Sequence, residues 1–422
     1  MLAAIGSAAF AERVGWQGRK DPSLTVDSKG LVIPELANLV TILRNDPGWA
    51  GVIAYDEFAG RVMKRKPPPF SPGETGEWMD IDDSRTALWL SQQYGLLRVR
   101  REVIEDAVLM TADQNRVHEV RDYLQSLQWD GKDRLKHWLH LYLGAEDSAY
   151  ARLVSVKWMV GAVARVMRAP LETKMDNVLI LEGPQDQGKS SALRILGRQW
   201  FTDAAFEIGS TDGYQIIRGV LIVELAEMDG FNRADASRSK AFFSRGADRY
   251  RNPYGRKPIN VVRQCVFAGS VNHATYLKDD TGNRRYWPVT VGYIALDELR
   301  QDVDQLWAEA LKMYRDGVTW WAVASEKDMF TDQQDQRYVG DAYEDRIRAW
   351  LDTPDAGGMK IMRVTTREIL QECLKLDVAK WTLAEQQRVG RIMARIARPR
   401  RKLPSGSREW VYERPVTGKA PQ

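Results

Sequence analysis

The run NVLILEGPQDQGKSSALRILG, residues 177–197, restricts the fold of this chain more than any other part of the sequence. A continuous apolar segment ends at Gly183, four residues separate it from the triplet Gly188-Lys189-Ser190, and apolar residues then recur at helical spacing. Such glycines let backbone N–H groups surround phosphate oxygens, and the lysine and the hydroxyl complete the contacts to phosphate and Mg²⁺. The run therefore predicts a strand, a phosphate-binding loop and a helix within an α/β fold.

ATP with Mg²⁺ is the expected ligand of this loop. Lys189 is predicted to contact the β- and γ-phosphates during catalysis, and Ser190 is predicted to hold the metal ion. The residues expected to bind the nucleotide are Gly183, Gln185, Gln187, Gly188, Lys189, Ser190 and Ser191. A glycine loop with an incidental lysine is the alternative, and the flanking strand and helix disfavour it.

The length and composition indicate a globular protein of several domains. The chain has 422 residues, of which 44% are apolar and 28% charged, and no uninterrupted apolar stretch is long enough to span a bilayer. Its opening, MLAAIGSAAFAERVGW, lacks the basic start of a secretory signal, so we predict a cytoplasmic protein without membrane attachment. Neither the two cysteines nor the four histidines have zinc-ligand spacing.

Four regions are predicted along the chain. Residues 1–115 give mixed signals and predict a small α+β or helical domain, and residues 116–172 predict a helical collar. Residues 173–320 alternate strand and helix, as in a parallel sheet with helices on both faces. Residues 321–422 predict a helical linker followed by a basic domain.

An acidic pattern in the first region, Asp80-Ile81-Asp82, raises the question of a metal site. Two alternating strand carboxylates can bind metal ions in a primase-type site. No third carboxylate or histidine follows at a suitable spacing in the sequence. The favoured interpretation is a solvated cluster at a helix N-terminus that ends at Asp83-Ser84.

Two acidic residues follow a second apolar run, Val220–Val223. Ligands gather at the carboxyl ends of strands in open α/β sheets, so we expect this strand to neighbour the strand of the phosphate loop. Glu224 is assigned to the water-mediated Mg²⁺ shell and Glu227 to activation of the attacking water, and an exchange of these roles stays open. Two surface carboxylates after a core strand are the alternative.

Three further candidate catalytic residues lie later in the chain. Asn272 ends an apolar strand pattern and suits the orientation of the attacking water or sensing of the γ-phosphate, although asparagine is also a common turn residue. Arg284 and Arg285 precede another apolar strand. One of them is expected to stabilise transition-state charge at the site of a neighbouring subunit, and which one it is stays open, since either can make a structural ion pair.

The segment SRGADRYRNPYGRKPINVVR, residues 244–263, is predicted to form a basic hairpin. It holds six lysines and arginines against one aspartate, with tyrosines between them. Phosphate contacts and tyrosine stacking on single-stranded DNA are expected of Arg251, Tyr254, Arg256 and Lys257. A solvated hairpin without a ligand is the alternative.

The C-terminal end is strongly basic. Residues 391–414 carry eight lysines and arginines against two glutamates, whereas the whole chain has a net charge of +4. The order of helix, break, helix and two short strands predicts a winged-helix-like domain. Duplex DNA contacts are expected of Arg391, Arg395, Arg401 and Lys402, and a winged fold used only for protein contacts is the alternative.

The motifs together resemble those of the virulence-associated protein E (VirE) family, which comprises ATPases of phages and genomic islands related to superfamily 3 and poxvirus-type primase-helicases. The segments that carry the resemblance are, in chain order, SLQWDGKDRL, GPQDQGKSS, VELAEM, FFSRGADRYRNPYGR, FAGSVN and DDTGNRRYWPV. The resemblance covers about residues 116–320, and the ordered set is more specific than any single motif.

The resemblance implies an AAA+-like P-loop ATPase core that assembles as a ring, hexameric in the expected form, with sites at subunit interfaces and the hairpin facing the pore. The site residues that it implies are Lys189 and Ser190 for nucleotide and Mg²⁺, Glu224 and Glu227 as the acidic motif, Asn272 as the sensor, and Arg284 or Arg285 as the finger. In many related ATPases the two acids are adjacent, whereas two residues separate them here. The resemblance supports a helicase-like ATPase and not primer synthesis.

We therefore expect a DNA-dependent, Mg²⁺-dependent ATP hydrolase that serves a phage or mobile genetic element as a replicative helicase or translocase on single- and double-stranded DNA. The alternative is a DNA-binding regulator whose ATP site only switches its assembly. A GTPase is disfavoured because no Asn-Lys-x-Asp guanine signature occurs. Translocation polarity, ring size, DNA sequence preference, an interference role, and a separate primase or replication initiator as partner stay open.

Overall fold

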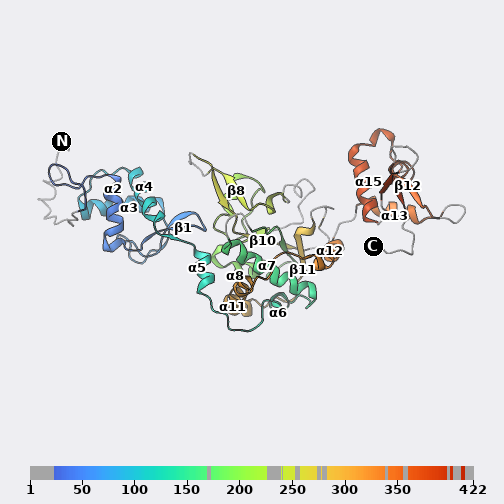
Figure 1. Ribbon diagram of the computed structural model, residues 1–422, viewed down its shortest axis with the longest axis horizontal. Coiled ribbons are helices and arrows are strands. Elements are labelled where there is room, and N and C mark those ends of the chain that lie inside the picture. The colour runs from blue at the N-terminus through green and yellow to red at the C-terminus, as the bar shows by residue number, and fades with distance from the viewer. Residues whose placement is uncertain are drawn as a thin grey trace.

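The chain forms three successive regions along its long axis (Figure 1). The computed structural model describes residues 23–168, 173–225, 239, 241–251, 257–272, 277, 283–337, 341–354, 360–396, 400–402 and 410–413. We refer to residues 23–117 as the N-terminal region, 118–337 as the central region and 341–413 as the C-terminal region. No helix in the described part of the chain combines the length and apolar character needed to cross a membrane.

The N-terminal region is α+β rather than all-helical. Its sheet has the order β3-β2-β1-β4, in which only the β1–β4 pair is parallel. The elements are α2 (Leu36–Asn45), β1 (Ile53–Asp56), β2 (Arg61–Lys64), β3 (Gly76–Glu77), α3 (Asp80–Tyr94), α4 (Arg101–Asp113) and β4 (Arg116–Val117). Because β4 completes this sheet, the predicted all-helical collar begins with a strand that belongs to the region before it.

The acidic cluster Asp80–Asp83 opens helix α3 as predicted, and Asp80 is exposed, but Asp82 and Asp83 are buried. Asp82 is completely buried, and its Oδ2 lies 2.6 Å from the Nζ of Lys64, which is also buried. Asp83 accepts a hydrogen bond of 2.9 Å from the indole N–H of Trp78, and burial raises the pKa of its carboxyl group. The prediction of a solvated cluster was therefore wrong for Asp82 and Asp83. The cationic partner of Asp82 comes from β2, which a local sequence pattern does not reveal.

The central region is an α/β fold with a parallel sheet, as predicted. The sheet has the order β11-β5-β10-β7-β6, and every neighbouring pair is parallel. Its strands are β5 (Val178–Glu182), β6 (Phe201–Thr202), β7 (Ile222–Leu225), β10 (Val266–Val271) and β11 (Tyr286–Thr290). The sequences of these strands are almost continuously apolar because parallel strands are covered on both faces.

Alternate residues of these strands enter two separate hydrophobic clusters. Leu179 and Leu181 pack in the larger cluster, whereas Val178 and Ile180 pack in the smaller one on the opposite face. The helices of this region are α5 (Glu119–Ser126), α6 (Trp138–Leu143), α7 (Ala149–Met167), α8 (Lys189–Gly197), α9 (Thr211–Ile216), α11 (Leu296–Arg315) and α12 (Lys327–Gln336). Helices α7, α8 and α11 contribute to the larger cluster, and α9 contributes to the smaller.

The C-terminal region contains the predicted helix, break, helix and pair of strands, together with one strand that was not predicted. Its elements are α13 (Glu344–Asp352), β12 (Arg363–Thr365), α14 (Thr366–Glu368) continued by a π-helical turn Ile369–Cys373, α15 (Leu383–Arg395), β13 (Arg400–Lys402) and β14 (Trp410–Glu413). The additional strand, β12, pairs with β14 in an antiparallel sheet of order β12-β14-β13. This sheet and the helices enclose a core that includes Val364, Leu370 and Met393.

Candidate functional site

The predicted phosphate loop joins the end of β5 to the start of α8. Gly188 caps α8 in the left-handed conformation with φ of 89°, and Asp186 has φ of 64°, a conformation that residues other than glycine rarely adopt. At Gly183 an added Cβ would lie 2.5 Å from Oε1 of Gln187. The loop conformation therefore favours glycine at position 188, whereas a side chain at position 183 would displace the end of Gln187. Gln185, Ser190 and Ser191 are exposed on it.

Lys189, the first residue of α8, folds its side chain back into the loop. Its Nζ donates hydrogen bonds to the carbonyl oxygens of Gly183 at 2.6 Å and Pro184 at 2.7 Å, and it lies 3.4 Å from Oδ1 of Asn272. Burial lowers the pKa of the ammonium group, and the negative charge of Glu224 opposes this shift. The structure thus brings together three of the predicted site residues, Lys189, Asn272 and Glu224.

Glu224 lies on β7 and is 2% exposed. Its Oε1 accepts hydrogen bonds from the hydroxyl groups of Ser190 at 2.7 Å and Ser270 at 2.9 Å. Its Oε2 is shielded from solvent and has no hydrogen-bond partner among the residues that the structure describes. A buried carboxylate oxygen without a partner is costly, so this position is suited to a ligand that donates a hydrogen bond or carries positive charge.

Strand β7 is not the immediate neighbour of β5, contrary to the prediction. Strand β10 lies between them, because it pairs in parallel with both. Ser270 belongs to this middle strand, and sequence reasoning missed its role. A hydroxyl within the otherwise apolar run VFAGSV was the signal that could have identified it.

The two candidate arginines differ in their surroundings. Arg285 donates a hydrogen bond of 2.9 Å to Oγ of Ser244, and its Nε lies 3.5 Å from Oδ2 of Asp176. Arg284 is exposed and makes no ion pair with any residue that the structure describes. Arg285 is therefore bound within its own chain, whereas the side chain of Arg284 is accessible to a neighbour. Glu227, the second predicted acid, lies outside the described residues.

An ion pair that the sequence did not indicate lies at the end of β5, just before the loop. It neutralises the carboxylate of Glu182. Arg337, at the end of α12, contacts both carboxylate oxygens of Glu182 at 2.8 and 2.9 Å. The hydroxyl of Thr290 donates a third hydrogen bond, of 2.8 Å, to Oε2 of the same side chain. A bidentate pair of this kind removes an unpaired negative charge from the base of an anion-binding loop.

The predicted basic hairpin is present, with β8 (Ala247–Tyr250) paired antiparallel to β9 (Ile259–Val262). Arg251 and Lys257 are exposed at the ends of these strands. The other two residues of the prediction, Tyr254 and Arg256, lie outside the described residues. At least two cationic side chains next to these strands are therefore exposed to solvent.

The predicted DNA contacts of the C-terminal region are only partly described. Arg391 is exposed on α15, and Arg395 lies 3.2 Å from Oδ1 of Asp335 on α12. Arg401 and Lys402 lie on β13, but their side chains are outside the described part. One of the four predicted residues, Arg395, thus contacts the central region of the same chain.

Comparison with known proteins identifies the central region. A model of the virulence-associated protein E-like domain matches residues 124–339, just over half of the chain, so the chain belongs to this family. No curated protein matches it.

Two solved structures of the NrS-1 C-terminal region, both apo, are similar to the chain. The first has 13% identity and a TM-score of 0.40, covering 69% of this chain and 77% of that one. The second has 11% identity and a TM-score of 0.46, covering 88% and 99%. These values are low, and neither likeness bears on the function of this chain.

Proposed function

We propose that this member of the virulence-associated protein E-like family is a Mg²⁺-dependent ATPase that acts on DNA as a ring-forming helicase or translocase in the replication of a phage or another mobile genetic element. One observation carries the proposal. Lys189, Glu224 and Asn272 come from three separate segments and gather with Ser190 around one loop at the carboxyl ends of parallel strands. This is the edge of an open α/β sheet at which ligands bind.

The loop residues fit a nucleotide and its metal ion. The Nζ of Lys189 is held by two carbonyl oxygens of the loop, within reach of phosphate groups in the same cradle. The buried Oε2 of Glu224 leaves an acceptor for water in the Mg²⁺ shell. MgATP, when bound, supplies the γ-phosphoryl group that is transferred to water. It also supplies the divalent cation that stabilises the negative charge of this transfer.

Each residue has a separate task in this proposal. Lys189 would hold the phosphates, the hydroxyl group of Ser190 would hold the metal ion, and Glu224 would accept a hydrogen bond from water next to that ion. The exposed amide of Asn272 orients the attacking water. Glu227 keeps its proposed role in activating that water, and the pairing of Ser190 with Glu224 supports the assignment of Glu224 to the metal.

The proposed ring would place a cation from a neighbouring subunit at the γ-phosphate. Arg285 contacts Asp176 and Ser244 of its own chain, so Arg284 is the proposed finger for the neighbouring subunit. A hexamer would repeat this contact around the ring.

DNA binding is proposed for two surfaces. The hairpin would meet single-stranded DNA through Arg251 and Lys257. The helices and three-stranded sheet of the C-terminal region support a winged-helix-like module on duplex DNA, with Arg391 on the exposed face of α15.

Hydrolysis of ATP by the full chain, measured with and without single-stranded DNA, tests the proposal. Wild-type protein is expected to hydrolyse ATP faster with DNA, and Lys189→Ala is expected to lower both rates by about a hundredfold or more, because phosphate contacts are lost. Lys312→Ala is the matched control, since this lysine lies half-exposed on α11 beside Asp316. Normal hydrolysis by Lys189→Ala would refute the ATPase. Hydrolysis that DNA fails to stimulate would favour an ATP-switched regulator over a motor.

A further inference from the structure

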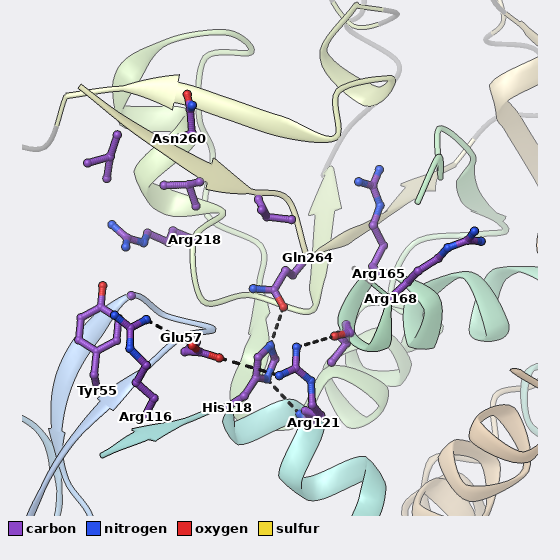
Figure 2. A pocket seen from close by; sticks show the side chains of 15 residues that line it. Tyr55, Glu57, Arg116, His118, Arg121, Arg165, Arg168, Arg218, Asn260 and Gln264 are labelled. Atoms are coloured by element: carbon purple, nitrogen blue, oxygen red, sulfur yellow. Dashed lines mark hydrogen bonds and ion pairs between the residues drawn. The ribbon is translucent and has the colours of Figure 1, made fainter. Parts of the chain in front are cut away.

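A basic pocket lies where the N-terminal region meets the central region (Figure 2). Its volume is about 480 Å³, within the range of sites that enclose a small molecule. Its walls come from β1, β4, α5, the end of α7, the turn after α9 and strand β9. Among the described residues that line it, five are arginines and one is a glutamate. The lining is therefore strongly positive although the chain as a whole is nearly neutral.

Arg218 supplies the positive charge on one side of the pocket. Its side chain crosses Gly60, where an added Cβ would collide with the guanidinium group, and Gly60 has φ of 65°. The Nε of Arg218 is shielded from solvent and has no hydrogen-bond partner, and no carboxylate in the described part of the chain pairs with it. Arg218 is half-buried, and a half-buried cation without a carboxylate partner is stabilised by a bound anion.

The opposite side of the pocket carries two arginines that pair with nearby carboxylates. Arg116 and Arg121 share the carboxylate of Glu57, at 3.3 and 3.9 Å. Figure 2 shows these three side chains grouped below Arg218. Arg116 also pairs with Asp113, so these two arginines face two carboxylates. The uncompensated positive charge of the lining therefore comes from Arg218 on the other side.

His118 joins this side of the pocket to the end of the hairpin. Its Nδ1 accepts a hydrogen bond from the backbone N–H of Arg121, so Nε2 carries the proton and donates to Oε1 of Gln264 at 2.6 Å. Burial lowers the pKa of His118, so the ring is neutral at pH 7. The anion-binding capacity therefore comes from the arginines and does not depend on His118.

We propose that this pocket binds the phosphate groups of a DNA single strand that continues from the hairpin. One wall is strand β9, which presents the exposed side chain of Asn260, and the same strand follows the exposed Lys257. A DNA strand bound to the hairpin would therefore meet a second cationic surface at the base of the hairpin. The ligand in this inference rests on the proposed function, because DNA is the polyanion that the function supplies.

The double variant Arg116→Gln with Arg218→Gln tests the pocket. Binding of a labelled oligothymidylate is measured by fluorescence anisotropy without nucleotide over a range of salt concentrations. We expect the Kd to rise about tenfold and the slope of log K against log salt to fall by about 1.4, because two phosphate contacts are lost at roughly 0.7 each. The matched control is Arg152→Gln with Arg300→Gln, two exposed arginines on α7 and α11 that pair with aspartates outside the pocket.

Unchanged DNA affinity and salt slope in the double variant would overturn the proposal, as would a loss equal to that of the control. Unchanged DNA affinity together with weaker binding of pyrophosphate would assign the pocket to a free phosphate compound, and would also overturn it. Because the assay contains no ATP, a failure of ATP hydrolysis refutes the proposed ATPase without affecting this result.

Two single substitutions at exposed positions keep the proposal testable if the double variant does not fold. Glu57→Gln removes the carboxylate of the lining and is expected to tighten DNA binding about threefold, whereas Asn260→Asp adds one and is expected to weaken it by a similar factor. Shifts in the same direction, or none, would contradict a phosphate-binding pocket.

Discussion

Replacement of Asp248 by asparagine is expected to destabilise the base of the hairpin formed by β8 and β9. Asp248 lies on β8, and its two carboxylate oxygens accept hydrogen bonds of 2.5 and 3.0 Å from Arg263, which follows β9. The two side chains are only 5% and 1% exposed. The guanidinium carbon of Arg263 also lies 4.2 Å from the centroid of the Phe242 ring, so the pair is enclosed by apolar atoms.

The magnitude follows from the burial of both charges. Removal of one partner of a buried ion pair costs about 3–5 kcal/mol, because the other charge stays desolvated without compensation. Asparagine keeps one acceptor oxygen but turns an amide donor towards the guanidinium donors of Arg263. We therefore expect Asp248→Asn to lower the free energy of unfolding by about 3 kcal/mol, a large part of the roughly 5–15 kcal/mol typical of a domain.

Urea unfolding followed by tryptophan fluorescence measures this change. Asp203→Asn is the matched control, since Asp203 pairs with Arg194 at 2.6 Å while both side chains are about half exposed, and a loss below about 1 kcal/mol is expected there. The paired replacement Asp248→Leu with Arg263→Met should recover much of the stability, because it leaves no buried charge. A cost of Asp248→Asn no larger than that of the control would refute the reasoning.

Two further predictions concern the N-terminal region and the proposed subunit interface. Lys64→Met leaves the buried carboxylate of Asp82 without its closest cation, so the midpoint of thermal unfolding should fall by several degrees in calorimetry, corresponding to about 3 kcal/mol; an unchanged midpoint would contradict the pairing. Arg284→Ala should reduce ATP hydrolysis about a thousandfold with little change in unfolding, whereas Arg285→Ala should lower stability by breaking contacts within the chain. The reverse pattern in hydrolysis and unfolding assays would assign the finger to Arg285.

Much of the candidate site was predictable because its signals are local. The glycines, Lys189 and Ser190 lie within one turn and the start of one helix, and their spacing predicts a phosphate loop. The hairpin was predictable for the same reason, since a turn sequence between two short strands lies within a single segment. The position of Ser270 beside Glu224 was not, because it depends on which strand lies between the two ends of the site.

The sequence by itself determined the strand, loop and helix of the phosphate site, the basic hairpin and the order of elements in the C-terminal region, because periodicity and turn chemistry operate over a few neighbouring residues. The tertiary structure alone decided that β10 separates β5 from β7, that Asp82 is buried against Lys64, and that arginines from distant segments surround one pocket. The buried carboxylates of the site are paired with residues far away in the sequence. Ser190 and Glu224 are 34 positions apart, and Glu182 and Arg337 are 155 positions apart. The interaction energy of two charges depends on their distance in space. The order of residue types along the chain does not encode that distance.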